Sequence, residues 1–323
     1  MDTGVGGIRV RVSRKTVEAS GICSYELIRP DGEMLPGFSA GSHVDVHLPN
    51  GITRQYSLCN EPAERHRYMI AVLKDASSRG GSKAMHELVD EGCELLISPP
   101  RNHFQLAHPL QKSLLLAGGI GITPVLCMAE RLSALGAPFE MHYGARSEAA
   151  MAFRERIAWS AFAPNVHFHF DDGAPEQKFD LGAILDVPPP DTHLYVCGPK
   201  GFMDAVLTTA RSAGWPEARL HYEFFGATVV KPDDDGSFDV RIASSGKSIT
   251  VPRDKTVVQA LAAAGVEVLV SCEQGVCGTC LTRVLEGECD HRDMYLTEDE
   301  QLKNDQFTPC VSRARSPLLV LDL

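Results

Sequence analysis

Hydrophobic and polar residues alternate along the first third of the chain. Runs such as Ile8–Val12 and Val44–Leu48 follow a period of two and are separated by Gly, Pro and Asn turns. This pattern predicts an antiparallel β-barrel that extends to about Leu106. One helix is expected to interrupt the barrel, beginning at Ser82 and ending before Gly92.

At Lys112 the pattern changes, and apolar strands begin to alternate with helices. The predicted strands are Ser113–Ala117, Phe139–Tyr143, Val166–Phe170, His193–Cys197 and Arg219–Phe224. The predicted helices begin after Thr123, near Ala149, after Phe179 and after Pro199. This order is typical of βαβ units around a parallel sheet, so we expect an α/β doubly wound domain whose strands end at ligand-facing loops.

The last third follows a polar, proline-marked stretch between Gly226 and Gly236, which is typical of a linker. Beyond it we expect a hairpin of Phe238–Ile242 and Ser248–Val251 and an amphipathic helix over Val257–Ala264. Because 323 residues are too many for one compact core, the chain is predicted to be multi-domain. The predicted bounds are 1–106 for the barrel, 107–227 for the α/β domain, 228–237 for the linker and 238–323 for an α+β domain.

Charge and composition narrow the function classes. The net charge of −11 argues against nonspecific binding to nucleic acid and favours a basic protein partner. No apolar run is long enough to span a bilayer, and residues 1–15 lack the apolar core of a secretory signal. Ten cysteines in so long a chain do not indicate a small disulfide framework. We therefore expect no membrane segment, a cytoplasmic location, and thiols that are free or metal-bound.

Four cysteines have a spacing with a specific chemical meaning. Cys272-x4-Cys277-x2-Cys280, with Cys310 after 29 further residues, matches the plant-type ferredoxin spacing for a [2Fe–2S] cluster. Two glycines in the loop would let backbone N–H groups approach the sulfides. A structural zinc site and plain buried thiols remain alternatives, although zinc sites favour paired CxxC units. The cysteines outside the pattern are interpreted as small buried packing residues: Cys23, Cys59, Cys93, Cys127 and Cys289.

Two loops of the α/β domain are candidates for nucleotide binding. The first, between a buried strand and a helix, contains Gly118, Gly119, Gly121 and Thr123. The second, at the end of a later strand, contains Cys197, Gly198 and Pro199. Glycines in such loops let backbone N–H groups approach phosphate closely. Either loop alone could be a tight turn without a ligand, but both open on the same edge of the sheet, which favours a ligand crevice.

Asp171 and Asp172 follow the third strand of this domain, where a carboxylate could bind an adenosine ribose and repel a 2′-phosphate. They favour NADH over NADPH, whereas Arg146 nearby argues the other way, and two solvated turn aspartates are the alternative. His167 and His169 alternate on the same strand and are interpreted as a solvent face, not as ligands.

Two segments of the barrel suit an anionic, planar cofactor. Arg54, Tyr56 and Ser57 offer a cation, a flat aromatic ring and a hydroxyl on one strand. Arg79, Gly80, Gly81 and Ser82 precede or open the predicted helix, whose free N–H groups and cation predict a phosphate site. Each segment alone could be a plain strand or a capped helix. Together with the nucleotide loops and the cysteines, they indicate a bound flavin.

In combination these motifs resemble the phthalate dioxygenase reductase family, which includes vanillate O-demethylase reductases. The resemblance covers essentially the whole chain, in the order flavin barrel, NAD domain and α+β ferredoxin-like domain, and the Arg-Gly-Gly-Ser loop resembles the FMN-binding branch. It implies that FMN is contacted by Arg54, Tyr56, Ser57, Ala71, Val72, Leu73, Gly80, Gly81 and Ser82. It further implies that Thr123 and Cys197 lie beside the nicotinamide and that Phe225 covers the flavin, although Phe225 could equally be core at a domain junction. The segment Asp290–Asp293 also matches the family, without an implied role.

The resemblance implies an NADH-dependent reductase that passes hydride to FMN and single electrons through the [2Fe–2S] cluster to a Rieske-type oxygenase component. The residues expected at the hydride step are Ser57, Thr123, Cys197 and Phe225. The alternatives are an FAD-containing reductase of a monooxygenase and a ferredoxin-type carrier that does not oxidise NADH. Self-contained domains allow a monomer, and the sequence does not name the aromatic substrate.

Overall fold

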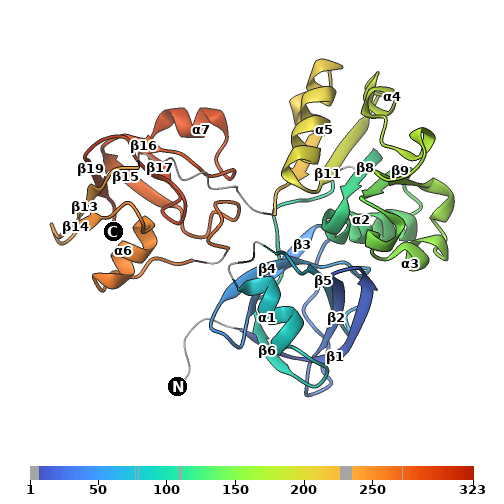
Figure 1. Ribbon diagram of the computed structural model, residues 1–323, viewed down its shortest axis with the longest axis horizontal. Helices are drawn as coiled ribbons and strands as arrows, with labels where there is room; N and C mark the ends of the chain where they lie inside the picture. Colours follow the sequence, from blue (N-terminus) through green and yellow to red (C-terminus); the bar gives the residue numbers. More distant parts are fainter. Residues whose placement is uncertain (1–6, 77, 79, 109–110, 226–234, 271) are drawn as a thin grey trace. The chain divides into compact units, whose positions relative to one another are not determined.

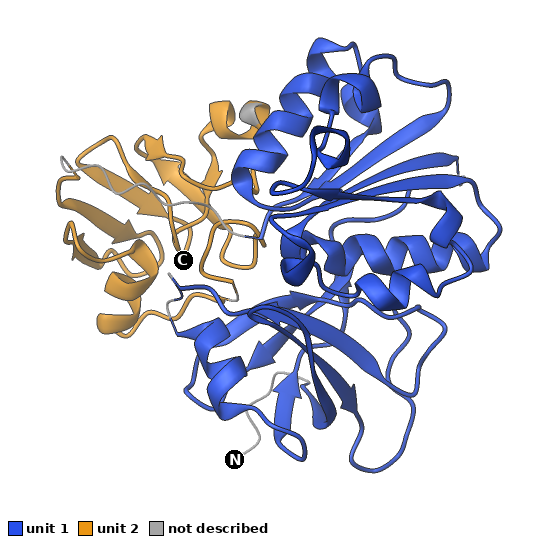
Figure 2. Cartoon of the chain, turned by 45° about the vertical axis from the view of Figure 1, so that its right-hand side comes forward, with its two compact units in different colours: residues 1–225 blue, residues 226–323 orange. Residues whose placement is uncertain are grey.

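The computed structural model describes residues 7–76, 78, 80–108, 111–225, 235–270 and 272–323. The chain forms two compact units, residues 1–225 and 226–323 (Figures 1 and 2). The first unit holds an antiparallel sheet and a parallel sheet, and the second a mixed sheet. Most of the predicted linker lies outside the described residues, so the predicted domain bounds stay a prediction.

The N-terminal sheet closes into a barrel. Its strands are β1 (Ile8–Ala19), β2 (Ile22–Ile28), β3 (Ser42–His47), β4 (Thr53–Ser57), β5 (Tyr68–Leu73), β6 (Glu94–Ile97) and β7 (Arg101–Asn102). They pair antiparallel in the order β4-β3-β6-β1-β2-β5, with β7 beside β3. A bridge between Leu58 and Ile70 joins the two end strands of this order and closes the sheet. The predicted antiparallel barrel is confirmed.

One helix, α1 (Gly81–Leu88), covers the barrel core. Ala84 and Met85 are its buried apolar residues, and the hydroxyl of Tyr25 donates to the Met85 carbonyl at 2.8 Å. Gly80 precedes the helix with φ +97°, a left-handed conformation that glycine adopts without strain. The helix thus begins one residue before the predicted Ser82.

The parallel sheet runs in the order β10-β9-β8-β11-β12. Its elements are β8 (Lys112–Gly118), α2 (Ile122–Ala134), β9 (Phe139–Ala145), α3 (Arg154–Ala158), β10 (Val166–Phe170), α4 (Leu181–Leu185), β11 (Thr192–Cys197), α5 (Lys200–Ser212) and β12 (Leu220–Glu223). Single turns of 3-10 helix occur at η1 (Gly119–Gly121), η2 (Glu148–Ala150), η3 (Ala163–Asn165), η4 (Pro175–Gln177) and η5 (Glu217–Arg219). The predicted doubly wound domain is confirmed. The chain order reverses between β8 and β11, which is where such sheets bind ligands.

The barrel and the parallel sheet share a hydrophobic core. Phe104 and Leu106, which follow the barrel, pack in one cluster with Leu126 of α2 and Tyr195 of β11. The Tyr195 hydroxyl also accepts a hydrogen bond from the Ala107 backbone N–H at 2.8 Å. These contacts hold the end of the barrel against the sheet, so strands of both can contribute to one site.

The second unit folds around a sheet in the order β14-β13-β19-β15-β17, with a separate β16-β18 pair. Its elements are β13 (Phe238–Ile242), β14 (Ser248–Val251), α6 (Val257–Ala263), β15 (Thr282–Glu286), β16 (Cys289–Asp290), α7 (Glu298–Lys303), β17 (Gln306–Phe307), β18 (Arg313–Ala314) and β19 (Leu318–Leu321). The predicted hairpin and helix are confirmed. Thr256 caps α6 by accepting from the Gln259 N–H, while Gln259 accepts from the Thr256 N–H.

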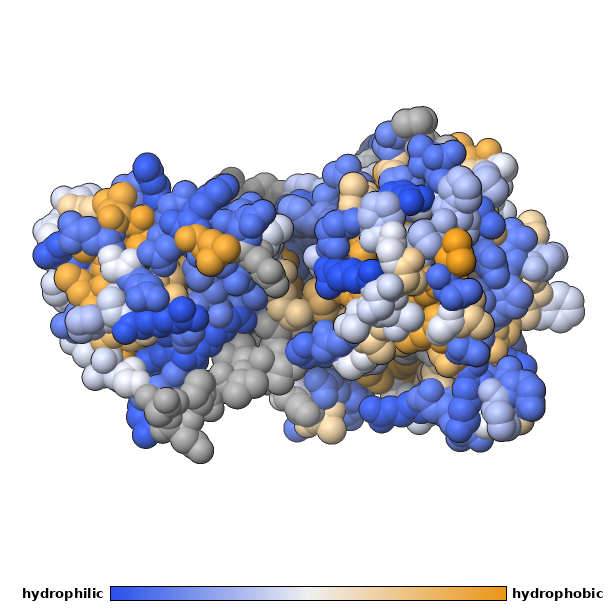
Figure 3. Space-filling view, turned by 90° about the horizontal axis from the view of Figure 1, so that it is seen from above, coloured by the Kyte–Doolittle hydropathy of each residue, from blue (hydrophilic) through white to orange (hydrophobic). Residues whose placement is uncertain are grey.

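The surface gives no sign of a membrane-embedded helix. On the face shown in Figure 3, hydrophilic residues predominate and apolar residues form separate small groups. Among the described residues, no helix is long and apolar enough to cross a membrane.

Candidate functional site

The two predicted nucleotide loops lie side by side, because β8 and β11 pair directly and Ala117 stands opposite Cys197. A Cβ on Gly121 would clash with the Cys197 carbonyl, and one on Gly198 would lie 3.1 Å from the Cα of Gly118. These three glycines are therefore required by close packing of one loop on the other. Gly119 differs: its φ is +53° and a Cβ there would have no neighbour within 4 Å. The space beside Gly119 is therefore open, where the predicted ligand would approach the loop.

The strand predicted to contact flavin ends beside these loops. Ser57, the last residue of β4, donates from its hydroxyl to the Glu223 carboxylate at 3.3 Å. Glu223 ends β12 and pairs with Cys197 on β11. Ser57 and Cys197, both predicted for the hydride step, thus meet at one buried carboxylate.

Glu223 is a residue that sequence reasoning missed. Its side chain is only 16% exposed, and this burial raises the pKa of its carboxyl to about 7, although the Ser57 hydrogen bond opposes the shift. His43 lies nearby, with Nδ1 3.9 Å from the Glu223 carboxylate, and burial lowers the pKa of His43 to about 4. Burial, reinforced by the Glu223 charge, raises the pKa of the Cys197 thiol well above its ordinary value. The group therefore holds a neutral imidazole, a neutral thiol and one carboxyl that titrates near pH 7.

Two other residues predicted to contact the nicotinamide or the flavin, Thr123 and Phe225, differ in how far they are buried. Thr123 is buried and its hydroxyl donates to the Ile120 carbonyl at 3.1 Å. Phe225, two residues beyond Glu223, keeps 38% of its surface exposed. Phe225 follows β12 (Leu220–Glu223), and a partly exposed aromatic ring has the flat apolar face that suits contact with a planar ligand.

Arg54 lies against the start of α1, as the predicted phosphate site requires. A Cβ on Gly81 would come within 2.7 Å of the Arg54 side chain, so only glycine fits there. The Ser82 hydroxyl accepts from the Asp75 N–H at 3.2 Å, which fixes the chain that enters the helix. Arg79 lies outside the described residues. A cation beside a helix N-terminus is the arrangement that the predicted phosphate site requires, and the phosphate site stays a prediction.

The remaining flavin residues divide between two faces of the barrel. Arg54 and Tyr56 share one face of β4 and Ser57 has the other, because side chains alternate along a strand. On β5, Val72 is 2% exposed and packs in the barrel core, whereas Ala71 belongs to the core shared with the parallel sheet and Leu73 is 40% exposed. β5 lies beside η1, since Cα atoms of the two elements approach within 8 Å.

Asp171 and Asp172 are exposed where β10 ends, at the edge of the parallel sheet. The Asp172 N–H donates to the Arg146 carbonyl at 3.2 Å, so the acidic pair and the competing arginine lie on adjacent turns. The ribose assignment stays a prediction.

The four predicted cluster cysteines are all buried, with between 3% and 8% of their surfaces exposed. They associate in two pairs: Cys272 hydrogen-bonds Cys277, and Cys280 hydrogen-bonds Cys310. The hydrogen bond from Cys272 lowers the pKa of Cys277 to about 5, which favours a thiolate.

This pairing separates the cluster from the zinc alternative. Around one tetrahedral zinc all four sulfurs would lie within about 4 Å of one another. In the described part of the chain, no three of these Sγ atoms lie within 4.8 Å of one another. Two thiolates for each of two irons is the arrangement that a [2Fe–2S] cluster needs.

The segment Asp290–Asp293 supports the cysteine loop. Asp293 is buried and accepts from the Ser312 hydroxyl at 3.1 Å and the Leu296 N–H at 2.8 Å. A Cβ on Gly275, in the cysteine loop, would lie 3.1 Å from the Asp293 Cα. Gly275 also has φ +70°, so the loop requires glycine on two counts.

Of the cysteines outside the pattern, four are buried as predicted: Cys23, Cys59, Cys127 and Cys289. Cys93 is only partly buried, and its sulfur accepts from the Asp90 N–H at 3.4 Å. Cys93 packs against the barrel core as predicted but is less buried than expected, because it lies in the turn that follows α1.

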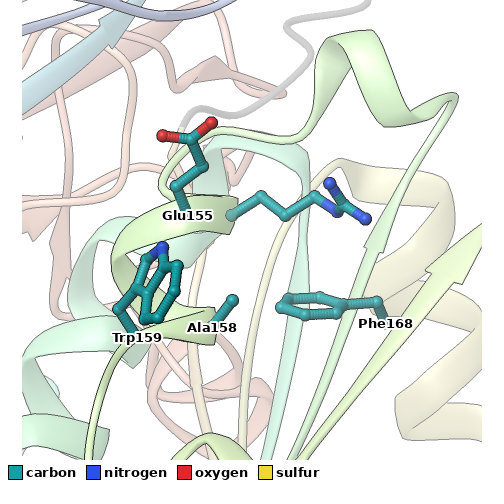
Figure 4. Close-up of a pocket in the computed structure, with 5 residues that line it drawn as sticks. Glu155, Ala158, Trp159 and Phe168 are labelled. Carbon is teal, nitrogen blue, oxygen red and sulfur yellow. The ribbon is translucent and has the colours of Figure 1, made fainter.

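A hollow of about 310 Å³ on the outside of the parallel-sheet domain contains none of the predicted site residues. Trp159, at the end of α3, and Phe168, on β10, flank Ala158 there, with Glu155 beside them (Figure 4).

Comparison with known proteins decides the family. The family described as "2Fe-2S iron-sulfur cluster binding domain" matches residues 240–315, and "Oxidoreductase NAD-binding domain" matches residues 115–208. The vanillate O-demethylase oxidoreductase of Pseudomonas sp. (strain HR199 / DSM 7063) is 55% identical over 98% of this chain and 100% of its own. The phthalate dioxygenase reductase of Burkholderia cepacia is 41% identical, covering 98% of both chains. A solved phthalate dioxygenase reductase, described as modular for electron transfer from pyridine nucleotides to [2Fe–2S], superimposes with TM-score 0.81 at 41% identity over 98% of each chain.

The chain belongs to the phthalate dioxygenase reductase family. Membership confirms the predicted fold class and the NAD-binding and [2Fe–2S] domains. The protein is an oxidoreductase with an NAD-binding domain and a [2Fe–2S] domain. The roles of individual residues stay predictions.

The signal for Glu223 was present in the sequence, since an acidic residue stands in the strand that leads to Phe225. Only the pairing of β11 with β12, and the approach of β4, reveal what that carboxyl contacts.

Proposed function

We propose that the chain is the reductase component of a Rieske-type O-demethylase that acts on a methoxylated aromatic acid. The sequence identities of the relatives support this choice. Two vanillate O-demethylase oxidoreductases are 55% and 56% identical to this chain, whereas the phthalate dioxygenase reductase is 41% identical to it. The observation that carries the redox role is the meeting of Ser57, Glu223 and Cys197, which joins a flavin strand to a nucleotide loop.

When bound, FMN accepts a hydride and releases electrons singly, a conversion that the one-electron cluster requires. The protein residues bind and orient. With the cofactors bound, Ser57 would offer its hydroxyl to the isoalloxazine, Thr123 and Cys197 would border the nicotinamide, and Phe225 would cover the flavin ring until NADH displaces it. Glu223 holds a proton on its carboxyl below about pH 7 and keeps the Ser57 hydroxyl oriented. Arg54 and the N-terminus of α1 bind the phosphate that distinguishes FMN from a bare flavin.

Asp171 and Asp172 bind the adenosine ribose of NADH in this proposal, and their charge disfavours a 2′-phosphate. The four paired cysteines hold the cluster that delivers electrons to the oxygenase. We expect the protein to act as a monomer in the cytoplasm, where a reducing environment keeps these thiols available.

Reconstitution tests the proposal. The holoprotein is mixed with NADH and, in parallel, with a methoxybenzoate O-demethylase oxygenase and a phthalate dioxygenase oxygenase, and oxygen uptake is measured with each aromatic substrate. We expect faster substrate-dependent uptake with the demethylase. Equal or faster uptake with the phthalate enzyme would contradict the demethylase assignment, and FAD in place of FMN in the denatured extract would favour the monooxygenase alternative.

A further inference from the structure

A cluster of histidines lies on the parallel sheet away from the nucleotide loops. β9 and β10 pair in parallel, with His142 opposite His167 and His169 opposite Gly144. His169 stacks on Phe179, with ring centroids 4.2 Å apart. The interpretation of His167 and His169 as a solvent face therefore holds only for His167, whose side chain is 52% exposed.

Three side chains of this cluster converge on one point. The Glu140 Oε1 atom lies 3.2 Å from His142 Nε2 and 3.3 Å from His167 Nε2. One ligand atom from each residue lies within 4.8 Å of the other two. The His142 side chain is 9% exposed, while Glu140 is 42% exposed, so the point is walled by protein on one side and open to solvent on the other.

A chain of hydrogen bonds fixes the proton positions. The Lys178 carbonyl can only accept, so His169 Nδ1, 3.2 Å away, must carry a hydrogen. In a neutral ring His169 Nε2 then accepts, and its partner at 2.9 Å, His142 Nδ1, must donate. A neutral His142 is left with a bare lone pair on Nε2.

That lone pair faces the Glu140 carboxylate, which is also an acceptor. A metal cation held between the two atoms would satisfy both of them, and the three ligand atoms lie close enough together to share one ion. His167 can donate to Glu140, but its hydrogen does not reach the lone pair of His142.

We propose that Glu140, His142 and His167 bind a divalent transition-metal ion of the Zn²⁺ type. Two imidazoles and a carboxylate suit this class of ion better than Mg²⁺ or Ca²⁺. His169 is the outer partner that orients the ligating ring of His142, as second-layer groups do in metal sites. The ion ties the edge strand β10 to β9.

A second histidine pair in the same sheet provides the contrast. His193 Nδ1 lies 2.7 Å from His221 Nε2, and His193 Nε2 lies 2.9 Å from the Gln111 amide oxygen. Here one neutral arrangement satisfies every atom: His193 donates to Gln111 and accepts from His221. No carboxylate faces a bare nitrogen in these contacts, so this pair needs no ion.

The experiment uses untagged holoprotein dialysed against Zn²⁺ in metal-free buffer, with zinc and iron measured in the same sample. We expect about one zinc per chain with iron unchanged. H167Q and E140Q should weaken zinc binding at least about tenfold, and H221Q should bind as the wild type does. Flavin content and NADH-dependent dye reduction, measured on each variant, report that it is folded.

Three results would overturn the proposal: no zinc bound while iron is retained, equal zinc affinity in H167Q and E140Q, or zinc that rises only as iron falls.

Discussion

The cysteine loop of the second unit takes most of its predicted ligands from one short stretch of sequence. The predicted flavin–nucleotide region of the first unit takes its residues from strands that are far apart in the sequence. Three of the four cluster cysteines lie within one short loop, and packing against the Asp290–Asp293 segment holds Gly275 of that loop in place. The flavin–nucleotide group draws Ser57, Cys197 and Glu223 from three strands. A site whose residues are close together in the chain can be recognised from their spacing in the sequence. A site whose residues come from different strands can be recognised only once the pairing of those strands is known.

The largest effect is expected from a variant that removes a cluster ligand and leaves the flavin–nucleotide region unchanged. Cys277→Ser removes one thiolate, so electron delivery to a one-electron protein acceptor such as cytochrome c should fall at least about a hundredfold. NADH-dependent reduction of a small dye should persist, because that step needs only the first unit.

Cys289→Ser is the matched control for this variant. Cys289 is buried in the same unit, but its sulfur is not among the paired thiols. Iron content and cytochrome c reduction should survive in it. Retained delivery in Cys277→Ser would remove Cys277 from the cluster.

Arg54→Ala addresses the flavin side of the comparison. Loss of a charge-assisted contact to phosphate should weaken FMN binding by roughly ten- to a hundredfold. The measurement is flavin content after extensive dialysis, with the exposed Arg11→Ala as control. Unchanged FMN retention in Arg54→Ala would place the phosphate elsewhere.

The same difference between local and distant residues explains which parts of the fold and the site could be predicted from the sequence. The barrel, the parallel strands and the cysteine ligands followed from periodicity and spacing. Glu223 did not, because its pKa depends on burial created by β4, β11 and β12 together. His169 was misinterpreted for a related reason: alternation alone could not show that Phe179 stacks on its ring.

Glu223→Gln should change the pH dependence of the flavin region alone. The carboxyl has its pKa raised to about 7, so the wild type is protonated at pH 6 and mostly ionised at pH 8. We expect flavin reduction by NADH to fall about tenfold over that range in the wild type and to stay flat in the variant. A wild-type profile without an inflection near pH 7 would contradict the assignment.

The same group links stability to pH. Because the folded pKa is raised above the unfolded value of about 4.5, the folded state binds more protons between about pH 4.5 and 7. Its contribution is complete below about pH 4.5 and is lost as the pH rises through about 7. The melting temperature of the wild type relative to Glu223→Gln should decline across that window.

The smallest expected effect concerns the ribose. Asp172→Ala should lower the preference for NADH over NADPH by a factor of about five, measured as the ratio of kcat/KM values. Asp186→Ala, exposed at the end of α4, is the control. An unchanged ratio in Asp172→Ala would leave Asp171 and Asp172 as ordinary turn residues.

Anaerobic rapid mixing of the holoprotein with NADH tests the relay most directly, with flavin and cluster absorbance followed in the same trace. The account predicts that the flavin bleaches first and the cluster is reduced after it, and that Cys277→Ser shows the first phase only. Reduction of the cluster without prior bleaching of the flavin, or no bleaching at all, would contradict it.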